Sequence, residues 1–248
     1  MELRIEDVKP GAKIYAGRYA IAAYEPQPIL WLKANNGLQI ISDKVLDYIV
    51  YDQAERTNRD APAFYYGNVD YMLSNINRYM NSDEYDWFEK THHDDEAPSY
   101  RRHPGFLYYF ADYEIKSIQS VDLPEHENLF VKDSDKYFQL FKKHGIRPHL
   151  TEDLLSHANL GIRETGYSGF WMQNVSPRNN GCVEYVMRDG YVSHQYPSYS
   201  GGLRPVITLA AGTKMHVNDD GTLSIAEFEV EESSAFSEDE LMSFLGLR

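Results

Sequence analysis

Cysteine is almost absent from this 248-residue chain, which contains only Cys182. One thiol excludes an intrachain disulfide and a metal site built from several thiolates. This scarcity fits a reducing compartment, so we expect a cytoplasmic protein. Cys182 could act as a nucleophile, but a lone cysteine among strand residues is more often a small buried hydrophobe.

Long apolar runs are also missing. No stretch approaches the roughly 18 apolar residues that a membrane-spanning helix needs. Residues 1–13 alternate charged and apolar side chains and lack the apolar centre of a signal peptide. We therefore expect no contact with a membrane.

Positive charge is scarce. The chain has 24 Lys and Arg against 38 Asp and Glu, which gives a formal net charge of -14. Such a field repels nucleic acid unless a basic patch overcomes it, and the basic pairs here are isolated. We expect no direct binding of nucleic acid. Acidity commonly serves solubility; the alternative is an acidic surface that occupies the basic groove of a nucleic-acid-binding protein.

Familiar catalytic motifs do not occur. There is no phosphate-cradling glycine loop, and residues 166–169 (G-Y-S-G) are one residue short of a nucleophile elbow. The densest group of potential metal ligands is His92 and His93, followed by the acids at 94–96. Adjacent histidines rarely converge on one ion, and their spacing matches no helical metal motif. The sequence predicts a solvated loop here, no cofactor and no metal, with a metal-dependent site as the alternative.

Tyrosine, by contrast, is abundant, with 20 residues. Its ring packs well on a half-buried strand while its hydroxyl reaches water, and it also supplies rigid contact area in recognition surfaces. The tyrosine content therefore favours a sheet-rich fold.

Turn dipeptides between apolar runs predict antiparallel strand pairs. Residues 29–32 and 38–41 flank Asn36-Gly37, a dipeptide typical of hairpin turns. In the second half, four further signals indicate strands and turns. A strand begins at 170–172, residues 183–187 face 191–195 across Asp189-Gly190, residues 203–210 are β-rich, and Asp220-Gly221 marks a tight turn.

Helical periodicity is confined to short segments. Apolar residues at helical spacing predict a helix over 68–82, capped by Asn68 or Asp70. Residues 83–102 read as a long loop, and 105–113 as a buried helical turn or a strand. Three further helices are predicted at 134–144, at 151–159 and near the C-terminus, where Ser237 and Glu240 have the spacing of a capping box. The chain is expected to form one mixed α+β domain, residues 1–248.

Three C-terminal segments carry the most distinctive pattern: 169–177 (GFWMQNVSP), 183–192 (VEYVMRDGYV) and 202–209 (GLRPVITL). They resemble the end of an uncharacterised bacterial and phage domain family, with W-L-R-S-P, a strand, D-G-x-V and G-V-R-P-A. Segments at 29–47 and 71–81 agree with this family in order. The resemblance spans about residues 10–210 and leaves 211–248 as a C-terminal extension that ends in a short helix. Residues 172–174 (M-Q-N) stand where the family has L-R-S.

The resemblance implies a fold related to the C-type-lectin-like and formylglycine-generating-enzyme-like proteins. This is a twisted antiparallel sheet flanked by short helices, with long loops between the last strands. Formylglycine generation in that superfamily relies on two cysteines, so the resemblance does not extend to that oxidase chemistry. Calcium-dependent sugar binding is not expected either, because the W-N-D motif is missing. Other relatives bind variable ligands through their C-terminal loops.

On this resemblance Trp171 and Arg204 are structural, with the arginine anchoring the tryptophan through a cation–π or backbone contact. The binding residues are expected in two loops, 174–180 and 194–201, whose amides, cation and tyrosines have the composition of an adaptable paratope. Ordinary polar loops are the alternative. The predicted ligand-binding residues are Asn174, Arg178, Asn179, Asn180, His194, Tyr196 and Tyr199.

Three functional hypotheses follow. The first is a non-catalytic cytoplasmic module that recognises a protein or a small ligand through its C-terminal loops. The second is an acidic, phage-encoded inhibitor of a nucleic-acid-binding host protein. The third is an enzyme with a dispersed metal-dependent site that includes His92 and His93. The fold does not specify the ligand, the oligomeric state or the pathway.

Overall fold

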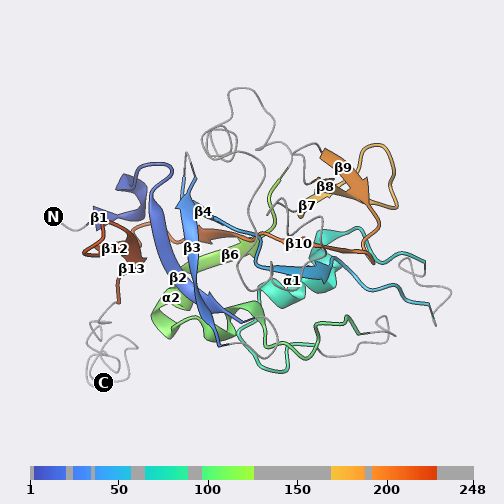
Figure 1. The fold of residues 1–248 in the computed structure, drawn as a ribbon, viewed down its shortest axis with the longest axis horizontal. Coiled ribbons are helices and arrows are strands. Elements are labelled where there is room, and N and C mark those ends of the chain that lie inside the picture. Colours follow the sequence, from blue (N-terminus) through green and yellow to red (C-terminus); the bar gives the residue numbers. More distant parts are fainter. Residues whose placement is uncertain are drawn as a thin grey trace, which may run out of the picture.

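Strands are the predominant regular secondary structure of the described part of the molecule (Figure 1). The structure is a computed structural model that describes residues 3–20, 25–34, 37–56, 65–88, 97–125, 169–187 and 192–227. Within these residues the strands form an eight-stranded and a five-stranded sheet. The larger sheet contains, in spatial order, β1 (Leu3–Arg4), β12 (Lys214–Val217), β13 (Leu223–Ile225), β2 (Lys13–Tyr19), β3 (Gln27–Lys33), β4 (Gln39–Ser42), β11 (Val206–Leu209) and β6 (Ile118–Asp122). The smaller sheet contains β5 (Asp47–Val50), β10 (Ser200–Leu203), β7 (Phe170–Val175), β8 (Val183–Val186) and β9 (Val192–Gln195).

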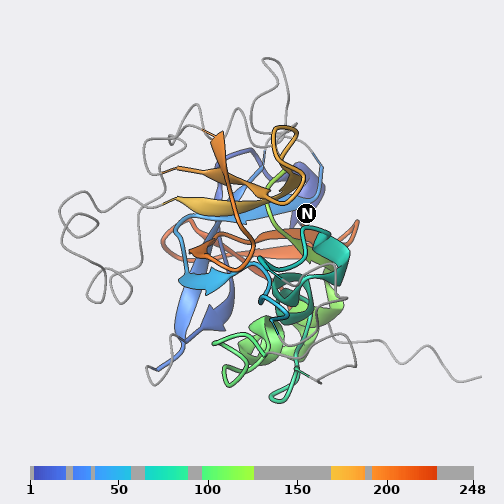
Figure 2. The same cartoon turned by 90° about the vertical axis from the view of Figure 1, so that its right-hand side faces the viewer.

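The helices of the described part are short, which agrees with the predicted α+β class. Figure 2 shows the yellow and light-orange strands β7 and β8 on one side of the molecule and the green helix α2 on the other. Strand pairing is antiparallel except between β13 and β2 and between β10 and β7. The helices are the 3-10 turns η1 (Ile5–Asp7), η2 (Tyr71–Leu73) and η3 (Phe106–Tyr109), with α1 (Asn75–Met80) and α2 (Asp112–Lys116).

The predicted hairpins are confirmed where the structure describes them. β3 and β4 pair with Trp31 opposite Ser42, and Gly37 has the positive φ of +74° that such a turn needs. β8 and β9 pair with Glu184 opposite His194, while the dipeptide at 189–190 lies outside the described residues. Gly221, with φ of +78°, forms the tight turn between β12 and β13.

The β-rich run predicted at 203–210 does contain strand residues, and these belong to two strands in different sheets. β10 ends at Leu203 and β11 begins at Val206, and Arg204 and Pro205 carry the chain from one sheet to the other. Proline has no N–H to donate to a ladder, which explains the break. Residues 42–47 make the same passage between β4 and β5. The two crossings run side by side: Ser42 N donates to Pro205 O at 3.0 Å, and Leu46 N to Leu203 O at 2.9 Å.

The predicted helix over 68–82 is too long, because the structure has two shorter helices there, η2 and α1. Ser74 has an extended backbone (ψ 154°) and separates η2 from α1. Its hydroxyl donates to Tyr71 O at 2.7 Å and accepts from Asn77 N at 3.4 Å, so the serine caps a new helix instead of continuing the old one. Asp70 caps η2, as expected, by accepting from Met72 N at 3.0 Å. Met72 itself is 70% exposed and does not join the buried stripe.

The other segment predictions have mixed outcomes. Residues 105–113 form a helical turn, η3, rather than a strand, and the described parts of 83–102 contain no helix or strand. Residues 214–217 and 223–225, placed in a C-terminal extension by the resemblance, are strands of the larger sheet, where β13 pairs with β2. The helices predicted at 134–144, at 151–159 and near Ser237 lie outside the described residues. No helix in the described part is long and apolar enough to cross a membrane.

One hydrophobic core draws on both sheets. Trp31 from the larger sheet and Trp171 from the smaller are both fully buried and belong to the same cluster, together with Tyr79 from α1 and Phe106 from η3. Trp31 Nε1 donates to Ala16 O at 2.9 Å, so its polar edge is satisfied inside the core. The smaller sheet, and with it the predicted binding loops, is therefore held on the larger one by shared packing.

Buried tyrosines predict a loss of stability at alkaline pH. Burial raises the pKa of several tyrosine hydroxyls, that of Tyr185 to about 12, whereas an unfolded tyrosine ionises near 10. Above about pH 10 an unfolded tyrosine has lost its proton while the buried one still keeps it, so unfolding releases protons. The free energy of unfolding that this burial contributes is therefore fully present below about pH 10 and falls as the pH rises from about 10 towards 12. Each such tyrosine contributes a slope of up to about 1.4 kcal/mol per pH unit. The other residues with raised pKa values include Tyr51, Tyr71, Tyr79 and Tyr100.

Urea unfolding at several values between about pH 8 and pH 11, with tyrosinate absorbance recorded in parallel, measures this slope. Full ionisation of all tyrosines near pH 10 in a protein of unchanged stability would contradict the burial that the structure shows.

Candidate functional site

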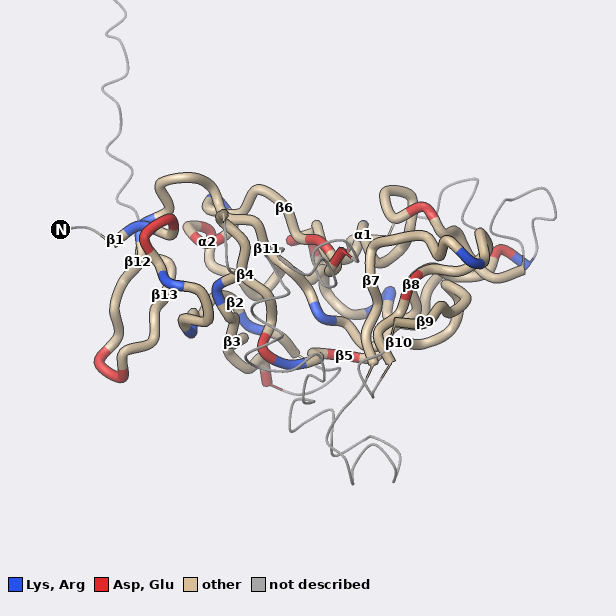
Figure 3. The backbone as a smooth tube through the Cα atoms, turned by 90° about the horizontal axis from the view of Figure 1, so that it is seen from above, with Lys and Arg blue, Asp and Glu red and all other residues tan. Residues whose placement is uncertain are grey.

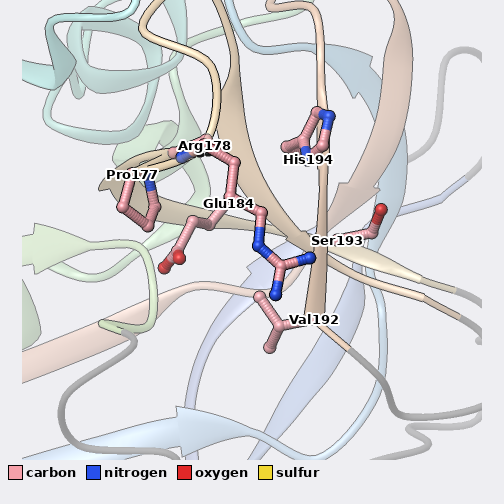
Figure 4. Close-up of a pocket in the computed structure, with 7 residues that line it drawn as sticks. Pro177, Arg178, Glu184, Val192, Ser193 and His194 are labelled. Carbon is pink, nitrogen blue, oxygen red and sulfur yellow. Dashed lines mark hydrogen bonds between the residues drawn. The ribbon is translucent and has the colours of Figure 1, made fainter.

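A small pocket lies where the loop after β7 meets β8 and β9 (Figure 4). Its volume is about 150 Å³. Sites for drug-sized molecules usually measure roughly 300–1,000 Å³, so this one suits a single side chain or a small ion. The residues that line it are Ser176, Pro177, Arg178, Glu184, Val192, Ser193 and His194.

Strand geometry explains how β8 and β9 contribute. Glu184 lies directly opposite His194 in the antiparallel register, and residues opposite each other present their side chains on one face. Val192 is two residues from His194 and therefore shares that face. Figure 4 shows the hydroxyl of Ser193 pointing to the other side of the strand. Three side chains from two strands thus form one wall of the pocket.

The loop between β7 and β8 supplies the opposite wall and is closed by its own hydrogen bonds. Ser176 N donates to Cys182 O and Cys182 N donates to Asn179 O, both at 2.9 Å. Within the loop, Gly181 N donates to Asn179 Oδ1 at 3.0 Å and Arg178 N donates to Ser176 Oγ at 3.2 Å. The backbone beneath the Arg178 side chain is therefore fixed, while the side chain itself is exposed.

The charged groups of the pocket point in different directions (Figure 4). The guanidinium of Arg178 extends towards β9 beside Val192 and Ser193, whereas the carboxylate of Glu184 points away from it. Glu184 is 4% exposed, and the imidazole of His194 is open to solvent. A guanidinium presents a planar fork of donors that matches carboxylate and phosphate oxygens. The open side of the pocket is therefore suited to a small anion.

The predicted binding residues fall into separate groups. Arg178 and His194 are brought together at the pocket. Asn174 lies within β7 rather than in a loop, because that strand continues to Val175. Asn179 holds the loop together through its side chain, and Asn180 is exposed and does not line the pocket. The binding loops are thus shorter than the sequence suggested.

Tyr196 and Tyr199 belong to a second surface, which we name the tyrosine platform. Its four members are Tyr65, Tyr66, Tyr196 and Tyr199. Tyr66 and Tyr196 stack with 3.9 Å between ring centroids and 19° between ring planes. Tyr65 lies 6.0 Å from Tyr66, and Tyr199 lies 5.8 Å from Tyr196. The platform therefore joins two loops that are more than a hundred residues apart in the sequence.

Comparisons with protein-family models, curated proteins and solved structures found no match for this chain.

Sequence reasoning missed Glu184, Val192 and the two tyrosines at 65–66. The hairpin predicted between 183–187 and 191–195 already placed Glu184 near His194, but the register that pairs them depends on the length of the turn. Tyr65 and Tyr66 gave no local signal. Their partners lie on a distant loop, so only the folded chain brings the four rings together.

Trp171 and Arg204 occupy buried positions behind the site. Trp171 is fully buried, and its Nε1 donates to Ile49 O at 2.9 Å. Arg204 is 2% exposed, and its Nε donates to Ser42 O at 3.1 Å. Its guanidinium carbon lies 5.2 Å from the ring centroid of Phe170, so the cation–π contact is with the neighbour of the tryptophan. Burial lowers the pKa of Arg204, since desolvation disfavours its charged form.

Cys182, the other chemical candidate in the described residues, does not line the pocket. Cys182 is 2% exposed, and burial raises the pKa of its thiol, so it is held as the unreactive protonated form. Within the described ranges, no three His, Cys, Asp or Glu side chains gather as a metal site. His92, His93 and the acids at 94–96 lie outside those ranges.

Proposed function

We propose that this chain is a non-catalytic binding module that recognises a small anionic group, free or carried by a partner protein, through the pocket beside β9. One observation carries the proposal: Arg178, on a loop with fixed backbone, and His194, on β9, line the same cavity of about 150 Å³. Two nitrogen-bearing side chains then face a space the size of a carboxylate or phosphate.

The pocket groups favour binding over nucleophilic catalysis. Neither pocket serine is presented as a nucleophile, because Ser176 Oγ accepts the N–H of Arg178 and the hydroxyl of Ser193 points away. A nucleophile needs an adjacent base within hydrogen-bonding distance. The buried, protonated thiol of Cys182 is equally unsuited to that role.

The same proposal includes a C-type-lectin-like fold and a cytoplasmic location. Antiparallel strands with short helices and a buried tryptophan in β7 of the smaller sheet support the former. The single buried thiol supports the latter. Acidic and basic residues are interspersed along the described backbone (Figure 3), whereas an acidic decoy needs a face of one sign. Within the described residues, this mixture of charges along the chain supports the binding module over the decoy.

Loss of the Arg178 guanidinium is expected to weaken anion binding by about ten- to a hundredfold, because a hydrogen bond to a charged group contributes about 1.5–3 kcal/mol. Arg178→Ala should show the full loss, and Arg178→Lys an intermediate one, since lysine keeps the charge but lacks the planar fork. Calorimetric titration with inorganic phosphate, with free glutamate and with a glutamate-containing peptide measures the effect. Binding of the free anions indicates a small ligand; binding of the peptide alone indicates a partner protein.

Arg101→Ala is the matched control, because Arg101 is also an exposed arginine and does not line the pocket. Equal losses in Arg101→Ala and Arg178→Ala would mean that binding follows overall charge. That result, or the absence of saturable binding to all three probes, would rule the proposal out.

A further inference from the structure

The tyrosine platform is a second exposed surface with its own chemistry. Tyr65 is 69% exposed, Tyr199 50% and Tyr66 44%, although large apolar rings are usually half-buried or more. Grouped exposed aromatics commonly mark a binding surface, because each ring buries a large area on contact. None of the four tyrosines lines the pocket beside β9.

Hydrogen bonds hold together the two loops that carry the platform. Ser198 N donates to Tyr66 O at 2.9 Å, which joins the two loops directly. Asp52 N donates to Pro197 O at 3.1 Å, and the Oδ2 of the same aspartate accepts from Asn68 N at 2.6 Å. The buried Asp52 is thus bonded to both loops. The rings are presented on a fixed base, so a partner need not order the backbone when it binds.

Gly67 makes this close approach possible. A Cβ at this position would lie 2.5 Å from Asp52 O and 3.1 Å from the Cβ of Pro197, and the residue has a φ of +83°. Only glycine fits both the left-handed backbone and the contact. The local sequence therefore places the tyrosines at 65–66 against the 196–199 loop.

The charge around the platform and of the whole chain favours a cationic ligand. The two loop segments, 65–70 (YYGNVD) and 196–201 (YPSYSG), contain one charged residue, Asp70, and no lysine or arginine. Tyrosine ring faces carry negative electrostatic potential and attract cations, and guanidinium groups stack flat upon them. The net charge of -14 adds a long-range attraction for positive ligands and repels nucleic acid.

We propose that the tyrosine platform is a docking surface for an arginine-bearing segment of a partner protein. Arginine is favoured over lysine because its planar, weakly hydrated guanidinium can cover a ring, whereas an ammonium remains strongly hydrated. This surface uses residues other than those of the pocket and a ligand of opposite charge. It is therefore independent of the anion-binding function.

Fluorescence anisotropy with labelled octa-arginine tests this surface, with octalysine and octaglutamate as comparison peptides. Octa-arginine is expected to bind, octalysine more weakly and octaglutamate not at all. The double variant Tyr65→Ala/Tyr199→Ala should weaken octa-arginine binding by about tenfold, since two exposed cation–π contacts are lost. Tyr65→Phe/Tyr199→Phe should retain binding, because the ring faces remain.

The matched control is Tyr85→Ala/Tyr108→Ala, a second pair of exposed tyrosines, 58% and 43% exposed, whose rings lie 5.8 Å apart outside the platform. The affinity of this control for octa-arginine should stay within about twofold of that of the unchanged protein, a smaller change than the loss of one cation–π contact would cause. Equal weakening in both double variants, equal affinity for octalysine and octa-arginine, or no binding of octa-arginine would each overturn the proposal. Circular dichroism of the variants confirms that the altered surface tyrosines leave the fold intact.

Discussion

Trp171→Ala is expected to lower the free energy of unfolding by about 3–5 kcal/mol, the range for removing a fully buried tryptophan. The indole has no exposed surface, and its Nε1 donates to Ile49 O. Edge-on ring contacts with Tyr51 at 5.7 Å and with Tyr185 at 5.2 Å would also be lost. A small domain has only about 5–15 kcal/mol of stability, so this change alone brings the protein close to unfolding.

Urea unfolding followed by circular dichroism measures the loss, with Trp171→Phe as the graded variant. Phenylalanine keeps most of the ring volume but leaves the carbonyl of Ile49 without this donor, so an intermediate loss of about 2–3 kcal/mol is expected. Tyr85→Ala, at a ring that is 58% exposed, should cost less than about 1 kcal/mol. A loss below that level for Trp171→Ala would contradict the burial of this side chain.

Gly202→Ala is expected to cost about 3 kcal/mol, at the upper end of the usual range for overpacking. A Cβ there would lie 2.3 Å from Gly169 O and 2.9 Å from the Cγ1 of Val45. The first contact is with the backbone just before β7, the strand that pairs with β10 through Phe170 opposite Gly202. Neither strand can yield without separating β10 from β7, so the strain is not relieved by turning a side chain.

Gly37→Ala provides the matched comparison for backbone conformation without crowding. Gly37 has a φ of +74°, but a Cβ there would meet nothing within 4 Å. Its cost should be about 1–2 kcal/mol, the usual penalty for a left-handed L-residue. Thermal unfolding of both variants separates the two causes. A smaller loss for Gly202→Ala than for Gly37→Ala would show that β7 and β10 are packed less closely than the structure indicates.

Local features of the fold could be predicted from the sequence because short segments determine them. Asn36-Gly37 and Asp220-Gly221 marked hairpins that the structure contains, since the turn residues and their flanking strands are adjacent in the chain. The break at Ser74 was missed because a serine in an apolar stripe is compatible with helix until its hydroxyl has a better partner. Hydrophobic periodicity alone does not show whether such a serine continues a helix or caps a new one.

Long-range arrangements could not be predicted in the same way. The parallel pairing of β13 with β2 joins residues about two hundred positions apart, and no sequence feature of either segment identifies the other as its partner. The same holds for the candidate sites. Arg178 and His194 lie sixteen residues apart and were both predicted, whereas Tyr65 and Tyr66 meet Tyr196 only in the folded chain. Sequence reasoning therefore found the candidate residues that lie close together in the chain and missed those that come from a distant segment.

The paired crossings at 42–47 and at 203–206 give the molecule two adjacent covalent straps between its sheets. A single connection would allow one sheet to rotate relative to the other. Here the two connections are hydrogen-bonded to each other at both ends, and Arg204 also donates to Ser42 O, so rotation and sliding of the sheets are both restricted. The smaller sheet, whose strands β8 and β9 line the pocket, is in this way held in one orientation on the larger sheet, so the pocket walls keep their positions when the rest of the surface fluctuates.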